Sequence, residues 1–132
     1  MRYLGIDYGD KRIGIAISDE EGKFAFPKLV VRNEWLEVRK TLSDFISSEH
    51  IKGIVIGLPQ NFKGKDTQQT KKVRDFAEKL KKELGVEVVF ENEILTSRQI
   101  KKTGASTREM IDASSAALIL QSYLDRKHST LQ

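Results

Sequence analysis

The feature that most constrains the fold is an uninterrupted apolar run at residues 53–57, which reads G-I-V-I-G and is bounded by glycine at both ends. Such a run is typical of a strand that is covered on both faces, as the strands of parallel sheets are. Apolar residues at helical spacing follow, and Gly85 is placed to end that helix. A second apolar run at residues 86–90 comes next. The alternation predicts two parallel strands joined by a right-handed crossover.

The first half of the chain has a different pattern. Residues 3–7 form a short apolar run that ends in Asp7, and residues 13–17 alternate isoleucine with small residues, which is the period of a strand. A third strand is expected over parts of 24–31, where Pro27 would interrupt or bend it. Turn-forming residues separate these segments, so we expect an antiparallel meander.

Two further helices are predicted. One covers the apolar positions from Trp35 to Ile46, and the other runs from about Thr107 to Arg126 with Thr107 or Ser106 as its N-cap. The order is therefore βββαβαβα. It predicts an α/β fold with a mixed five-stranded sheet and helices on both faces, formed by one domain over residues 1–132.

Composition limits the function. The absence of cysteine excludes disulfides, thiolate metal sites and a cysteine nucleophile. We see no signal peptide and no apolar stretch that approaches the roughly 20 residues of a membrane span, so we expect a cytoplasmic protein without a membrane partner.

The formal charge is +4, which is compatible with a nucleic-acid partner but also with an ordinary solvated surface. The basic residues gather in two clusters: Lys63, Lys65, Lys71, Lys72 and Arg74, and then Arg98, Lys101, Lys102 and Arg108.

Acidic residues follow elements that would meet at one edge of the sheet. Asp7 ends the first strand, Glu91 and Glu93 follow the last strand, and Asp112 lies in the first turns of the final helix beside small residues that allow close packing. Clustered carboxylates repel one another, and a divalent cation such as Mg²⁺ relieves that repulsion. Each acid alone has a plainer interpretation: Asp7 would shape a turn, Asp112 would favour the helix dipole, and the glutamates would be surface charges.

Four motifs carry a resemblance that spans nearly the whole chain. They are G-I-D-Y-G-D-K-R-I-G-I-A-I-S-D at 5–19, G-L-P-Q-N-F-K-G at 57–64, N-E-I-L-T-S at 92–97 and I-D-A-S-S-A-A-L-I-L-Q at 111–121. With these motifs the sequence resembles the YqgF family. That family is described as Holliday-junction-resolvase-like proteins and as nucleases for the precursor of small-subunit ribosomal RNA.

The resemblance implies a ribonuclease H-like fold and a metal-dependent nuclease that hydrolyses phosphodiester bonds. It selects Glu93 over Glu91, so that Asp7, Glu93 and Asp112 would be the catalytic, metal-binding acids for Mg²⁺ or Mn²⁺. It also makes Arg12, Asn61 and Lys63 candidates for binding substrate, although Arg12 would otherwise pair with an acid and Asn61 would otherwise shape a turn. The favoured substrate is the 5′ end of pre-16S rRNA, in ribosome biogenesis, with branched DNA as the rival.

The sequence also departs from the family pattern. Ile94 replaces an arginine, Asn92 replaces an aspartate, and the segment before Asp112 is shorter than usual, while Glu109 would offer a fourth carboxylate. These changes leave open a non-catalytic nucleic-acid or transcription adaptor. The opening G-I-D-x-G is also similar to the first phosphate loop of sugar kinases and actin-like ATPases, although these need two such lobes. Either a monomer or a homodimer is compatible with the sequence.

Overall fold

The computed structural model describes residues 1–61, 63–92 and 108–130, and the side chains of the last helix over residues 113–128. The element order is β1 (Arg2–Tyr8), β2 (Arg12–Ser18), β3 (Ala25–Arg32), α1 (Trp35–Ser48), β4 (Ile51–Leu58), α2 (Gln68–Leu84), β5 (Glu87–Asn92) and α4 (Arg108–Thr130). This is the predicted order. The N-cap predicted for the last helix, at Ser106 or Thr107, lies outside the described residues.

The five strands form one mixed sheet in the order β3-β2-β1-β4-β5. β1, β2 and β3 are antiparallel neighbours, whereas β1, β4 and β5 are parallel, so the carboxyl ends of these three strands lie at the same edge. We call it the carboxyl edge. Opposite Pro27 the register of β2 and β3 shifts by one residue, which is the bend that the sequence predicts.

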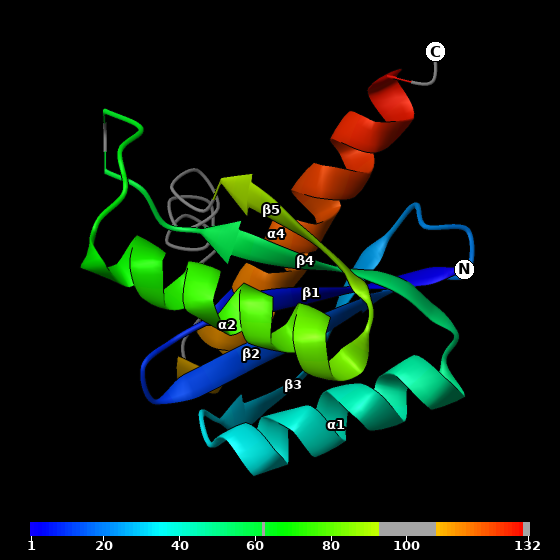
Figure 1. Cartoon of the computed structure of the whole chain (residues 1–132). Helices are drawn as coiled ribbons and strands as arrows, with labels where there is room; N and C mark the ends of the chain where they lie inside the picture. Colours follow the sequence, from blue (N-terminus) through cyan, green and yellow to red (C-terminus); the bar gives the residue numbers. More distant parts are fainter. Residues whose placement is uncertain (62, 93–107, 131–132) are drawn as a thin grey trace.

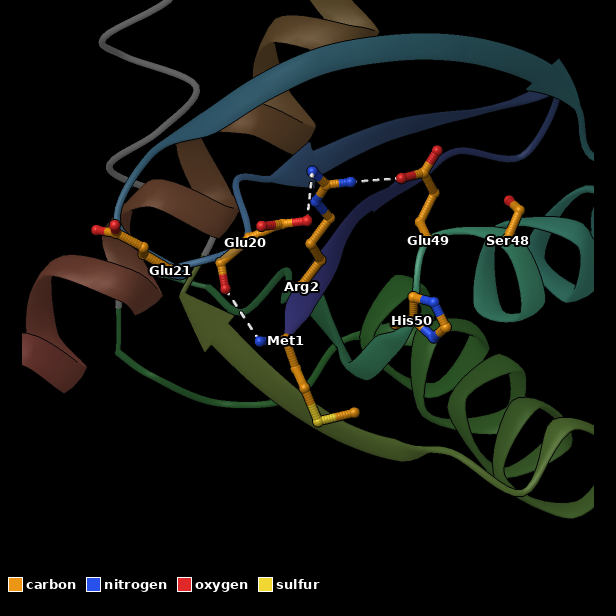
Figure 2. A pocket seen from close by; sticks show the side chains of 7 residues that line it. All are labelled: Met1, Arg2, Glu20, Glu21, Ser48, Glu49 and His50. Atoms are coloured by element: carbon orange, nitrogen blue, oxygen red, sulfur yellow. Dashed lines mark hydrogen bonds and ion pairs between the residues drawn. The ribbon is translucent and has the colours of Figure 1, made fainter.

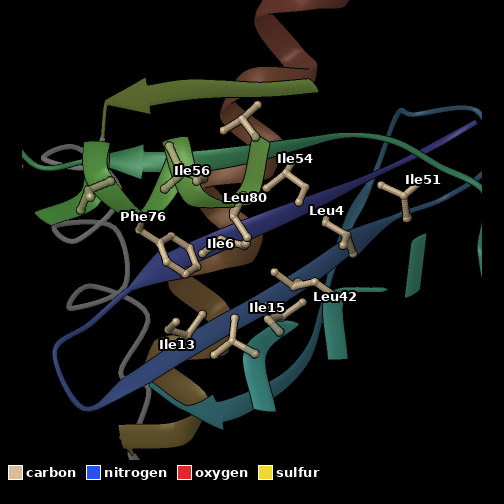
Figure 3. Packing of buried hydrophobic residues seen from close by; sticks show 14 residues of the cluster. Leu4, Ile6, Ile13, Ile15, Leu42, Ile51, Ile54, Ile56, Phe76 and Leu80 are labelled. Carbon is tan, nitrogen blue, oxygen red and sulfur yellow. The ribbon is translucent and has the colours of Figure 1, made fainter. Parts of the chain in front are cut away.

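Helices cover both faces of the sheet (Figure 1). On one face the isoleucine and leucine side chains of β1, β2 and β4 pack against α1 and α2, where Leu42, Phe76 and Leu80 meet them (Figure 3). On the other face a second apolar cluster joins Tyr3, Ala16 and Val55 to α4. Successive residues of a strand point to opposite faces, so each strand supplies both clusters.

The helix ends follow local chemistry. The Glu34 carboxylate accepts from the backbone N–H groups of Leu36 and Glu37 and so caps α1. Thr67 and Thr70 form a reciprocal capping box at the start of α2, and Gly85 ends that helix with a left-handed φ of 64°. The helix α4 continues past Arg126 to Thr130, so the expected end at Arg126 is too early. No helix in the described part of the chain is both long and apolar enough to cross a membrane.

Candidate active site

The site begins with Asp7, near the end of the central strand β1. Tyr3 belongs to the cluster on the α4 face, while Leu4 and Ile6 belong to the cluster on the opposite face. By this alternation the half-buried side chain of Asp7 lies on the α4 face. The predicted position at a strand end is confirmed, except that the strand continues one residue further to Tyr8.

Glycines flank Asp7 on both neighbouring strands. Asp7 pairs with Gly14 of β2, and the register of Ile6 with Ile56 continues to place Gly57 of β4 on its other side. Neither glycine adds a side chain to the α4 face. A buried glycine within a strand commonly marks a place where a ligand or another backbone comes close, and two of them flank this carboxylate.

The helix α4 approaches β1 closely at Gly5. A Cβ atom on Gly5 would lie 2.7 Å from both the carbonyl oxygen of Ala116 and the Cβ atom of Leu120, so only glycine fits. Tyr3 meets the later residue Tyr123, with the ring centroids 5.8 Å apart. Residue numbers in α4 therefore fall as those in β1 rise, and the two elements run antiparallel.

This antiparallel crossing places Asp112 toward Asp7. Asp112 precedes Ala116 by four residues, about 6 Å along the helix axis. Asp7 follows Gly5 by two residues, about 7 Å along the strand in the same direction. The backbone of the helix thus carries Asp112 toward the level of Asp7. Its side chain, like that of Glu109, lies outside the described residues.

Of the two glutamates that the sequence suggests for the site, the structure describes only Glu91. Glu93 lies outside the described residues. Glu91 was expected after the strand, where a surface charge was one interpretation, but it lies within β5 and is only 6% exposed. Its Oε1 pairs with Nη1 of Arg126 on α4 at 3.0 Å, whereas its Oε2 has no hydrogen-bond partner in the described part of the chain. The predicted end of the strand at Phe90 is too early: β5 continues to Asn92, which puts Glu91 on the same face as Val89.

The loop between β4 and α2 also lies at the carboxyl edge. Asn61 Oδ1 accepts from the backbone N–H groups of Lys63 and Lys65, so this side chain shapes the turn from which both lysines project into solvent. Asp66 bridges Gln60 and Arg74, at 2.8 Å from the Gln60 amide nitrogen and 2.9 Å from Arg74 Nε. The hydrogen bonds from Arg74 and then Gln60 hold the pKa of Asp66 below its ordinary value. The loop is therefore fixed by its own polar side chains.

Arg12 is half-buried at the start of β2, just after the turn that follows Asp7. In that turn Asp10 forms an ion pair with Lys72 of α2, with the Lys72 Nζ 3.2 Å from Oδ1. This ion pair joins the turn to α2, which carries Lys71, Lys72 and Arg74 of the first basic cluster. Among the second cluster, the side chains of Arg98, Lys101, Lys102 and Arg108 lie outside the described residues.

A cavity of about 530 Å³ lies at the other end of β1 (Figure 2). Arg2 forms ion pairs there with Glu49 and, at 3.8 Å, with Glu20, and the Met1 amino group donates to the Glu20 carbonyl at 3.0 Å. Glu20 and Glu49 are thus paired with Arg2 of the same wall, and the third acid, Glu21, pairs with Lys23 at 3.3 Å. It is separated from Asp7 by the length of the strand, and it holds none of the predicted site residues.

The donor set at the carboxyl edge suits a hard divalent cation. The oxygen ligands would be carboxylates, no thiolate exists in the chain, and the residues beside Asp7 on both neighbouring strands are glycines. Among the described residues no group of three or more His, Asp or Glu side chains could hold a metal ion. Two of the three predicted ligands, Glu93 and Asp112, have side chains outside that part of the chain.

The sheet order, the helices on both faces and the carboxylate near the end of the central strand define a protein of the ribonuclease H-like fold. Solved structures share this fold. The structure titled "T. thermophilus RuvC in complex with Holliday junction substrate" is 14% identical, with a TM-score of 0.60 and 98% of each chain covered. The Fowlpox virus resolvase in complex with Holliday junction DNA is 12% identical, with a TM-score of 0.57 and coverage of 96% of this chain and 99% of that one.

The particular family follows from the sequence matches. A family model described as "RuvX: Holliday junction resolvase" matches residues 1–126, and the chain belongs to this family of nucleases. A relative from Sulfurihydrogenibium sp. (strain YO3AOP1), named "Putative pre-16S rRNA nuclease", is 40% identical over 95% of this chain and 90% of its own length. A relative of the same name from Caldanaerobacter subterraneus subsp. tengcongensis is 35% identical over 98% of this chain and 100% of its own length. The predicted family, fold and enzyme class are confirmed.

Proposed function

We propose that this nuclease acts in the cytoplasm on the precursor of 16S ribosomal RNA, at the 5′ end, with Mg²⁺ or Mn²⁺ as its cofactor. The relatives at 40% and 35% identity carry that substrate in their names. The observation that carries the proposal is the antiparallel passage of α4 over Gly5, which brings the backbone of Asp112 toward Asp7 at the carboxyl edge.

Asp7, Glu93 and Asp112 would hold the cation. A divalent cation in such a site lowers the pKa of a bound water and neutralises charge on the phosphate oxygens. The protein positions the ligands. Asp7 projects from β1, which is paired with β2 at Gly14, and α4 packs against β1 through the close contact at Gly5.

Substrate would lie along the carboxyl edge. The Lys63 side chain is exposed on the loop after β4, and Arg12 begins β2, the strand on the other side of β1; we infer that both contact phosphate groups on either side of Asp7. Asn61 would act through the loop, since its side-chain oxygen already accepts two backbone hydrogen bonds. We expect either a monomer or a homodimer to present this edge.

The description of the family as a Holliday junction resolvase supports branched DNA as the second candidate substrate. Both substrates are tested in one experiment. Purified protein is incubated with Mg²⁺ or Mn²⁺ and either an RNA that spans the 5′ end of pre-16S rRNA or a four-way DNA junction. We expect cleavage of the RNA at a discrete position and little cleavage of the junction. Symmetric cuts in the junction with intact RNA would establish the resolvase function instead, and binding that persists in EDTA without cleavage of either would indicate an adaptor.

A further inference from the structure

The proposed function leaves one buried carboxylate unused. Glu91 lies on β5 with a side chain that is only 6% exposed. Val89, two residues earlier on the same face, packs into the cluster beneath α4, and Glu91 contacts Arg126 of that helix. The side chain is therefore enclosed between the sheet and α4.

Stability does not explain a glutamate here. Its Oε1 accepts from the Asn92 backbone N–H at 3.3 Å and pairs with Arg126, which is itself 60% exposed, while Oε2 is buried with no hydrogen-bond partner among the described residues. Burying a carboxylate with one oxygen unsatisfied is costly, and an apolar residue of similar size is often as stable or more stable at such a position. The cluster that contains Val55 and Val89 would simply extend to this position.

Glu91 lies level with Asp7 on the same face of the sheet. Gly57 pairs with Glu91, and the register of β1 with β4 places Asp7 on the other side of Gly57. Two strand spacings separate the two acids, about 10 Å between their Cα atoms, and the residue between them has no side chain. The unsatisfied oxygen thus belongs to the same row across the sheet as the first proposed metal ligand.

Arg126 limits how Glu91 can contribute, because it already holds Oε1. A contact through water fits these constraints better than direct coordination. Mg²⁺ gives up its waters reluctantly and usually keeps several of them in protein sites. Groups that hydrogen-bond to the ligands and waters of a metal typically change metal affinity 10- to 100-fold when they are removed.

We propose that Glu91 is a positioning residue of the cation site, with Arg126 fixing Oε1 and with Oε2 accepting a hydrogen bond from a water of the hydrated cation. This inference rests on the proposed function, because it requires a cation at Asp7. It assigns to the site an acid of β5, Glu91, and it gives Arg126, near the end of α4, a part in ordering the site.

The test uses Mn²⁺ alone, titrated into the full-length protein and followed by electron paramagnetic resonance. Glu91→Gln removes the charge, and Glu91→Leu fills the site with an apolar side chain that folds without a buried charge. We expect both variants to raise the Kd for Mn²⁺ about tenfold or more. Glu87→Gln is the matched control, because Glu87 lies on the same strand and face but is exposed, and its Kd should not change.

Thermal unfolding in EDTA and in excess Mn²⁺ separates positioning from folding. A purely structural role would lower the Tm of Glu91→Gln equally in both conditions, whereas a positioning role reduces the rise in Tm that Mn²⁺ produces. Unchanged Mn²⁺ affinity in both Glu91 variants would overturn the inference. If Asp7→Asn still abolishes Mn²⁺ binding in that case, the proposed function stands without it. If Asp7→Asn also binds normally, the cation site itself is wrong and both proposals fall.

Discussion

Gly5 of β1 lies so close to Ala116 of α4 that a Cβ atom on Gly5 would stand 2.7 Å from the Ala116 carbonyl oxygen. That oxygen is backbone and cannot move aside without moving the helix. Because Asp7 lies two residues beyond Gly5 on β1, and Asp112 lies four residues before Ala116 on α4, the contact at Gly5 sets how closely the backbone of α4 at Asp112 approaches β1. The spacing of the site is thus linked to a residue that carries no functional group.

Gly5→Ala should therefore impair the site by displacing α4. Overpacking of this kind typically costs about 1–3 kcal/mol of stability, and here the displacement also separates Asp112 from Asp7. We expect a lower urea midpoint and a fall in cleavage rate with substrate binding little changed.

Gly53→Ala is the control for that variant. A Cβ atom on Gly53 would lie 3.4 Å from the Glu87 carbonyl oxygen, which is ordinary contact, and an alanine is better suited to a strand than a glycine. Its activity should match that of the wild type. If Gly5→Ala and Gly53→Ala cleave at the same rate, α4 does not position an acid of the site.

The lysines of the β4–α2 loop, Lys63 and Lys65, should bind nucleic acid through ion pairs with its phosphate groups. Each phosphate contact on a single strand contributes about 0.7 to the slope of log K against log salt concentration. Removing both Lys63 and Lys65 as alanines should lower that slope by about 1.4 and weaken binding at low salt. Binding isotherms at several salt concentrations measure it.

Lys81→Ala with Lys82→Ala removes the same charge from the last turn of α2, at the end of the helix away from the loop. That double variant should keep the wild-type slope. Equal slopes in the two double variants would show that net charge, rather than the loop, accounts for binding.

The ion pair between Asp66 and Arg74 predicts a pH effect on the loop. In the folded protein the pKa of Asp66 lies below its ordinary value of 3.8. The ion pair therefore stabilises the loop above pH 3.8, and this stabilisation is lost as the pH falls through the lowered pKa. Arg74→Gln should raise that pKa toward 3.8 and increase KM, because Lys63 and Lys65 would be less well placed. Carbon-detected NMR titration of the aspartate carboxyls measures the shift.

Asp19 provides the internal control for this titration. Its pKa is lowered by the backbone N–H of Phe24, with smaller contributions from other backbone groups, in the turn between β2 and β3 at the end of the sheet opposite the carboxyl edge. The pKa of Asp19 should be the same in both proteins. If the pKa of Asp66 also stays unchanged in Arg74→Gln, Arg74 is not what orders the loop.

The sequence predicted the parallel strands of the second half because the apolar runs at 53–57 and 86–90 are bounded by turn and cap residues, and a strand–helix–strand connection has one favoured handedness. It predicted that Asp7 lies near a strand end because the apolar run of residues 3–7 leads into turn-forming residues. These features depend on turn and cap residues and on the spacing of apolar residues, both of which are visible in the sequence.

Other features depend on tertiary contacts that no local pattern records. Glu91 is buried because Arg126, 35 positions later in the sequence, pairs with it, whereas a charged residue after an apolar run reads as the end of a strand. Helix α4 continues past Arg126 because no glycine or proline ends it there, and Lys127 and His128 suit the negative end of a helix. Lys127 is also held by Tyr3, which raises the pKa of its ammonium group.

If Asp7 binds the catalytic cation, exchanging its carboxylate for an amide in Asp7→Asn should remove most of the cleavage activity. The variant should be compared with the wild type and with Asp10→Asn, which removes an exposed carboxylate from the adjoining turn. We predict that Asp7→Asn loses about a thousandfold in rate, as expected when a contribution of several kcal/mol is removed, while it folds normally and Asp10→Asn cleaves at nearly the wild-type rate. Undiminished cleavage by purified Asp7→Asn would show that this carboxylate does not bind the catalytic cation.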